Sequence, residues 1–289
     1  MAMAGITVVT DSTAYMPPSL VARLGIELIS LRFTFGGENG SVRELDVGDL
    51  GEFYDRLAAA ETLPITQPPL LEECTDLYRR LVADGGSVVS VHISSGLSET
   101  CSVARKAAAG LGADGERVHI LDSVATSGQL GLLALAAAQT ASAGGSVEEV
   151  VDTVRQARLE SRLYWLLDTL DYLRRGGRIG SAAAWIGSTL NIKPILTLES
   201  EIKAVERVRT RERGLERLVD LSRQLQAAGA TAYFVTHTRC PDDARALVER
   251  LQEVFWRPPE FVEELGPVVG THTGPGLLGC GGLPVRFLE

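Results

Sequence analysis

A histidine between two threonines is the feature near the C-terminus with most potential for chemistry. Residues 268–276 read VVGTHTGPG, so His272 is flanked by Thr271 and Thr273 and followed at once by Gly-Pro-Gly. Glycine and proline favour a turn in which the backbone can approach a ligand closely. An imidazole in that position could donate a hydrogen bond to a carboxylate. We predict that His272 leaves an apolar strand and lies at a ligand site.

Three further segments place hydroxyl groups after β-rich runs. They are TDST (residues 10–13), ISSGLSET (93–100) and LDSVATSG (121–128). The carboxyl ends of parallel strands share one edge of a sheet, where ligands bind. Helix N-capping is a purely structural alternative for each segment taken singly. Ser94 and Ser95 precede a predicted helix, so their hydroxyls and the helix N–H groups could hold an anion.

Residues 64–69, PITQPP, are predicted to form a rigid loop between two helices. Prolines on both sides hold Thr66 and Gln67 in extended geometry. A spacer and a binding loop would have the same sequence features, so both interpretations remain open here.

The segment LRRGGRIGS gathers Arg174, Arg175 and Arg178 around a glycine pair in an otherwise acidic chain. Solvated surface arginines are one interpretation. The other is a local basic patch that meets an anionic ligand or an acidic partner.

The elements that must position these residues change in character along the chain. In the first half, β-rich runs such as GITVVTDS, IELISLRFTF, SVVSVHIS and RVHILDS alternate with amphipathic helical patterns. This alternation predicts a mainly parallel sheet with helices on both faces. From about residue 163, a predicted hairpin and isolated strands between helices indicate an α+β unit. We therefore predict an α/β protein with an N-terminal α/β domain, 1–158, and a C-terminal α+β domain, 159–289.

The composition excludes several classes of protein. Of the 289 residues, 45% are hydrophobic and 22% charged, which is typical of a globular protein, and the net charge of −9 argues against nucleic-acid binding. No signal peptide or span of about 20 apolar residues is present, and four scattered cysteines indicate neither a metal site nor a disulfide framework. We expect a cytoplasmic protein with no cofactor, no metal and only transient membrane contact.

Motifs of common catalytic machinery are also missing from the sequence. There is no P-loop, HExxH or GxSxG sequence, and the GxGxxG match that begins at Gly274 comes too late to open a dinucleotide fold. Hydroxyls and a histidine without an evident activated nucleophile favour binding over catalysis. The alternative is a stand-alone hydrolase or transferase that uses Ser95 with His272 and Asp11. A DNA-binding regulator conflicts with the acidic composition and lacks a recognisable helix-turn-helix.

Read together, six motifs resemble the DegV family of bacterial proteins over nearly the whole chain. The motifs are TDSTAY, the Gln67-Pro68 loop, ISSGLSET, LDTLDYLRRGGRIG, LNIKPIL and THTGPG. The resemblance implies a two-domain protein that buries one long-chain fatty acid, such as palmitate or stearate, between its domains. It also implies a carrier without catalytic residues. Such a carrier presents the carboxylate to a separate ATP-binding fatty acid kinase subunit, which forms acyl phosphate for phospholipid synthesis.

The resemblance further implies which residues hold the carboxylate. Thr66, Ser94 or Ser95, and His272 match the family's head-group positions, Thr273 adds a hydroxyl beside the histidine, and Arg178 matches a basic segment that could contact the partner. Three departures bear on this set. Ile65 precedes Thr66 where the family usually has threonine before Ser-Gln-Pro, Glu99 replaces a usual glycine, and Tyr15 replaces a usual aspartate.

Overall fold

A parallel sheet forms the N-terminal half, as the alternating pattern predicted. The structure is a computed structural model that describes residues 5–38, 40–186 and 192–289, so Leu190 and Asn191 of the LNIKPIL motif lie outside the described residues. The sheet has the order β2-β1-β6-β7 with every neighbouring pair parallel. Its strands are β1 (Ile6–Asp11), β2 (Glu27–Ile29), β6 (Ser87–His92) and β7 (Val118–Asp122).

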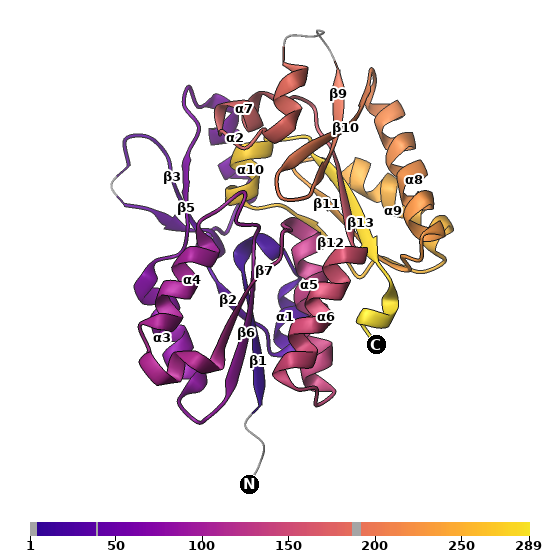
Figure 1. The fold of residues 1–289 in the computed structure, drawn as a ribbon. Coiled ribbons are helices and arrows are strands. Elements are labelled where there is room, and N and C mark those ends of the chain that lie inside the picture. The colour runs from indigo at the N-terminus through magenta and orange to yellow at the C-terminus, as the bar shows by residue number, and fades with distance from the viewer. Residues whose placement is uncertain (1–4, 39, 187–191) are drawn as a thin grey trace.

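Helices cover both faces of this sheet (Figure 1). The helices α3 and α4 pack together on β6 and β7, and α5 and α6 pack on β1 and β6 from the other side. The helices of this half are α1 (Pro18–Leu24), α2 (Leu50–Ala59), α3 (Leu71–Val82), α4 (Thr100–Ala109), α5 (Ser127–Ser142) and α6 (Val147–Glu160). The prediction of a helix-covered parallel sheet is confirmed.

The C-terminal half is built on a mixed sheet of order β10-β9-β8-β13-β11-β12, in which only β11 and β12 pair in parallel. Its strands are β8 (Arg162–Leu166), β9 (Lys193–Leu198), β10 (Ile202–Val208), β11 (Ala232–His237), β12 (Phe261–Glu264) and β13 (Leu278–Leu283). Its helices are α7 (Asp171–Arg175), α8 (Arg211–Ala227), α9 (Pro241–Phe255) and α10 (Pro267–Thr273). The predicted hairpin is β9 and β10, and the α+β assignment holds.

A small third sheet corrects two of the predictions. The run IELISLRFTF is not one strand: β2 joins the parallel sheet, while β3 (Arg32–Thr34) pairs with β4 (Val42–Arg43) and β5 (Ile65–Gln67). The predicted loop at residues 64–69 therefore contains an edge strand, with Thr66 opposite Phe33. Prolines around it favour extended backbone and block further pairing, which suits an edge strand.

The segment that carries His272 is a helix and not the apolar strand predicted from its valines. Pro267 occupies the first turn of α10. The N–H groups of that first turn have no acceptor within the helix and donate instead to side chains from the N-terminal half of the chain. The N–H of Val268 donates to Glu44 Oε1 at 2.7 Å, and the N–H of Val269 donates to Tyr15 Oη at 3.1 Å. These long-range partners override the β preference of the valines.

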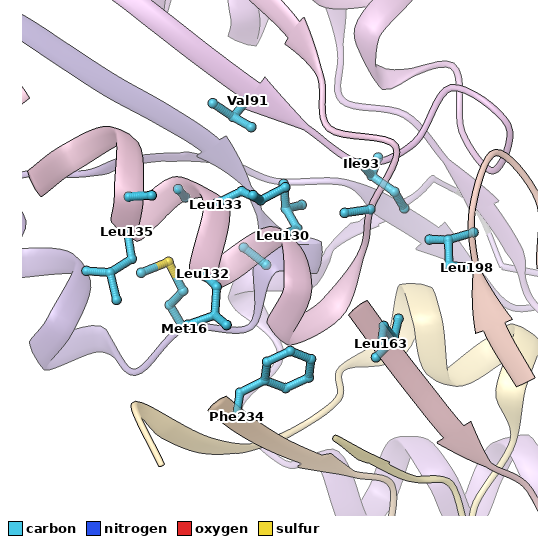
Figure 2. Packing of buried hydrophobic residues seen from close by; sticks show 14 of the residues in the cluster. Met16, Val91, Ile93, Leu130, Leu132, Leu133, Leu135, Leu163, Leu198 and Phe234 are labelled. Carbon is cyan, nitrogen blue, oxygen red and sulfur yellow. The ribbon is translucent and has the colours of Figure 1, made fainter. Parts of the chain in front are cut away.

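One hydrophobic core runs through both halves of the chain. Helix α5 is buried along most of its length because it lies between the two large sheets, in contact with β1 and β6 on one side and β11 and β13 on the other. Figure 2 shows Leu130, Leu132 and Leu133 of this helix near Ile93, Leu163 and Phe234. The division at residue 158/159 remains a prediction. None of the described helices combines the length and apolar character needed to cross a membrane.

Candidate ligand-binding site

A cavity of about 190 Å³ lies where the two halves meet. Both halves contribute to its walls, and most of the lining is apolar. The apolar lining residues are Leu31, Pro68, Ile93, Leu97, Trp165, Leu173, Ile202, Val268 and Val269. Such a cavity excludes water from an aliphatic ligand and stabilises it through the hydrophobic effect.

Polar side chains gather where this cavity meets a second, outer pocket of about 440 Å³. Thr66, Arg178 and His272 line both pockets, so they mark the junction between the apolar interior and the outer surface. Thr66 Oγ1 and His272 Nε2 lie 2.9 Å apart and form a hydrogen bond between β5 and α10. The mouth of the cavity thus consists of one neutral pair and one guanidinium.

His272 is held neutral by its surroundings. Burial, and secondarily the nearby Arg178 cation, lower the pKa of its imidazole from 6.5 to about 4. Its Nδ1 atom is buried and has no hydrogen-bond partner in the described part of the chain. That nitrogen packs on Gly176 so closely that an added Cβ there would lie 2.2 Å away. Only glycine at position 176 leaves room for this ring.

The tautomer of the imidazole decides what the mouth can offer a ligand. If Nε2 carries the proton, His272 donates to Thr66 Oγ1 and leaves the threonine O–H free to donate to a carboxylate. If Nδ1 carries it, the hydroxyl of Thr66 donates to Nε2 and is lost to the ligand. In the first arrangement His272 donates to Thr66, and Thr66 donates in turn to a ligand at the cavity mouth. It needs no positive charge on the histidine.

Arg178 links the two halves at the mouth. Its Nη1 donates to the carbonyl of Gly176 at 2.9 Å, and its Nε points to the carbonyl of Leu97 at 3.4 Å. Leu97 follows the Ser-Ser-Gly motif, so the guanidinium lies against the segment after β6. Thr273 also lines the cavity, but its hydroxyl donates to the carbonyl of Val269 within α10.

Ser94 and Ser95 are placed differently from the other predicted site residues. The buried hydroxyl of Ser94 accepts from the N–H of Gly96 at 3.2 Å and shapes the loop. Ser95 is exposed, and its N–H donates to Asp122. In the described structure neither serine belongs to the lining of the cavity or of the outer pocket. Their roles as ligand residues therefore remain a prediction.

Ser98, Thr126 and Trp165 line the cavity although none of them was singled out from the sequence. Gln67 and Glu99, which the sequence motifs did name, line it as well. Thr126 belongs to the hydroxyl-rich segment after β7. The sequence predicted that this segment lies near a ligand site, but it did not indicate which residue of the segment lines the cavity. Trp165 lies inside the buried strand β8. Its apolar neighbours in the sequence predict a core residue and do not distinguish it from one that lines a cavity.

The conformation and packing of Gly274 explain why the Gly-Pro-Gly motif begins with glycine. It ends α10 with φ of 71°, and an added Cβ would lie 2.2 Å from the Tyr172 ring. The glycine lets the end of α10 pack on the aromatic side chain of α7. That the loop also approaches a ligand stays a prediction.

Ser95, His272 and Asp11, the residues of the hydrolase or transferase alternative, form hydrogen bonds with other groups and not with one another. Asp11 accepts hydrogen bonds from Thr13 and from the N–H of Ile93, and it lies 3.1 Å from His92 Nδ1. His272 pairs with Thr66, while Ser95 lies in an exposed loop. A serine relay requires nucleophile, base and acid to be hydrogen-bonded in order, so this arrangement disfavours it. The described residues also contain no group of three or more His, Cys, Asp or Glu suited to a metal ion.

Together, an α/β half and an α+β half surround one shared cavity that is apolar inside and polar at its mouth, an arrangement suited to a small amphipathic molecule. Residues 5–284 match the family model described as "Uncharacterised protein, DegV family". The chain belongs to the DegV family.

Known relatives extend over almost the full chain. A DegV domain-containing protein of Streptomyces coelicolor is 38% identical over 284 residues, covering 95% of this chain and 96% of the relative. A fatty-acid-binding DegV family protein from Thermus thermophilus superposes with a TM-score of 0.89 at 31% identity, covering 97% of this chain and 99% of that one. DegV of Bacillus subtilis, described as a fatty acid binding protein, gives a TM-score of 0.85 at 33% identity, with the same shares covered.

Proposed function

We propose that this protein binds one long-chain fatty acid, such as palmitate or stearate, with the tail in the cavity and the carboxylate at Thr66 and His272. The supporting observation is the arrangement of an apolar cavity that ends in a hydrogen-bonded Thr66–His272 pair. Relatives of known structure that bind fatty acids share the fold. Ser94, Ser95, Thr273 and Arg178 complete the proposed head-group region.

The energetics favour such a ligand. Burying about 14 methylenes at about 0.8 kcal/mol each contributes roughly 11 kcal/mol before ordering costs are subtracted. An unpaired carboxylate in the same cavity would cancel several kcal/mol of this. Hydroxyl and imidazole donors at the mouth offset that cost.

We further propose that the protein is a carrier and not an enzyme, and that it presents the carboxylate to a separate ATP-binding kinase subunit. A carboxylate oxygen attacks the γ-phosphorus of ATP, the bond to the β-phosphate bridging oxygen breaks, and ADP leaves as acyl phosphate forms. The partner supplies ATP and Mg²⁺. In support, Thr66, Arg178 and His272 border both the cavity and the outer pocket, so a head group held there is reachable from outside.

Denaturing extraction of the purified protein, followed by mass spectrometry, tests the first proposal. We expect about one fatty acid per chain. Turnover of an ester substrate without bound lipid, abolished by Ser95→Ala, would instead support the hydrolase alternative. The kinase step is tested by adding the loaded protein to a candidate kinase subunit with ATP and Mg²⁺ and trapping acyl phosphate with hydroxylamine. If the protein binds lipid but no acyl hydroxamate forms, the proposal of fatty-acid binding stands and the proposal of a kinase partner is contradicted.

A further inference from the structure

Two residues of the cavity lining each carry a buried polar atom that lacks a hydrogen-bond partner in the part of the chain that the structure describes. Thr126 Oγ1 and Trp165 Nε1 are buried and find no hydrogen-bond partner among the described residues. Thr126 is 0% exposed and Trp165 2%. Both residues line the cavity, and in the described chain neither lines the outer pocket, unlike Thr66, Arg178 and His272. They form a second polar region of the lining, distinct from the three residues that also border the outer pocket.

The sheet places the indole nitrogen beside further hydroxyls. Trp165, Gly279 and Thr236 are neighbours across β8, β13 and β11. A Cβ added at Gly279 would lie 3.0 Å from Trp165 Nε1 and 2.8 Å from Thr236 Oγ1, so both atoms flank the same glycine. Thr236 Oγ1 in turn accepts from Ser127 Oγ at 3.5 Å. The indole edge therefore faces the start of α5, where Thr126 lies.

This second polar region offers mainly hydrogen-bond donors. The indole N–H can only donate, whereas the hydroxyl of Thr126 can donate or accept. Thr126 is the N-cap of α5, but its side chain caps none of the N–H groups of the first turn. Those N–H groups and the helix dipole favour an oxygen acceptor. A plain hydrocarbon tail would leave these donors unpaired, at a cost in binding.

We propose that this second polar region is a subsite, which binds a hydroxyl or keto oxygen carried on the acyl chain away from its carboxylate. The subsite comprises Thr126, Trp165 and the first turn of α5. It rests on the proposed fatty-acid binding and adds a preference to it: oxygenated long-chain acids bind more tightly than the saturated parent acid. The hydroxyl of Thr126 and the N–H of Trp165 act as the specificity-determining groups.

A competition experiment tests the proposal. The purified protein is incubated with an equimolar mixture of stearic acid and octadecanoic acids that carry a single hydroxyl at different carbons, then washed, denatured and extracted for mass spectrometry. We expect one positional isomer to be enriched about tenfold over stearic acid, as one satisfied hydrogen bond implies. Thr126→Val and Trp165→Phe should each reduce the enrichment severalfold while retaining stearic acid. Thr126→Ser, which keeps the hydroxyl, is the matched control and should keep the enrichment.

The outcomes separate this proposal from the function on which it rests. Retention of stearic acid with no enriched isomer would overturn the subsite and leave fatty-acid binding intact, and the two polar atoms would then hold water only. Enrichment that survives Thr126→Val would also overturn it, whether or not Trp165→Phe folds. Retention of no acid at all would overturn the proposed function and the subsite together.

Discussion

Thr66 Oγ1 and His272 Nε2 lie 2.9 Å apart although 206 residues separate them in the chain. The contact joins the edge strand β5 of the N-terminal half to helix α10 of the C-terminal half. It closes one end of an apolar cavity with a hydroxyl and an imidazole that are paired with each other and carry no charge. The proposed head-group site depends on this pair.

Removing the hydroxyl of Thr66 should weaken fatty-acid binding while the fold remains. Thr66→Val keeps the shape and the β preference of the edge strand but leaves the carboxylate without one donor. We expect a loss of affinity of about tenfold, measured by titration with a fluorescent fatty acid. Thr66→Ser is the control and should bind nearly as the unaltered protein does. Equal affinity of the valine variant would remove Thr66 from the head-group site.

Removing the charge of Glu99 should strengthen binding. This carboxylate lines the cavity and repels a carboxylate at the mouth. We expect Glu99→Gln to raise affinity severalfold at low salt, with the gain shrinking as ionic strength increases. Glu116→Gln makes the same charge change at an exposed position outside the cavity lining and should have no effect. A gain of the same size in both variants would mean that only net charge matters.

Glu44 should make stability depend on pH. Its buried carboxyl accepts from Ser12, Tyr15 and the N–H of Val268, and desolvation raises its pKa from 4.5 to about 7. Between these pH values the folded protein holds a proton that the unfolded chain has released. Stability from this group is therefore fully present below about pH 4.5 and is lost as pH rises through about 7.

The shift of the Glu44 pKa corresponds to about 3 kcal/mol of unfolding free energy. We expect the stability of the unaltered protein to fall by about this amount relative to Glu44→Gln between pH 4.5 and 7.5, as denaturant titrations would measure. Comparison with the variant cancels other groups that titrate in the same range, including Glu263, whose pKa burial also raises to about 7. A pH-independent difference between the two proteins would contradict the assignment.

Helix α5 should tolerate no extra side-chain volume where it meets the second sheet. A Cβ added at Gly128 would lie 2.1 Å from the Phe234 ring. We expect Gly128→Ala to destabilise the protein by about 1–3 kcal/mol, the usual cost of overpacking, measured by chemical denaturation. Gly48→Ala meets nothing within 4 Å and serves as the control. A stable alanine variant at 128 would show that the two halves are not tightly packed there.

Local pattern was enough to predict elements whose partners are close in the chain. The parallel strands, the helix Val147–Glu160 and the β9–β10 hairpin follow from periodicity and turn residues. Helix α10 could not be predicted in this way, because its first turn is stabilised by Glu44 and Tyr15, more than 200 residues earlier. Among the site residues, the motifs pointed to Thr66, His272 and Arg178, but Trp165 reaches the cavity only through sheet pairing.

A crystal structure of the protein loaded with stearic acid would test the central claim most directly. We predict that the tail lies between the two large sheets, along Ile93, Leu173 and Val269, and that a carboxylate oxygen lies within hydrogen-bond distance of Thr66 Oγ1. A lipid bound elsewhere on the surface, or one whose carboxylate points away from Thr66 and His272, would contradict the account.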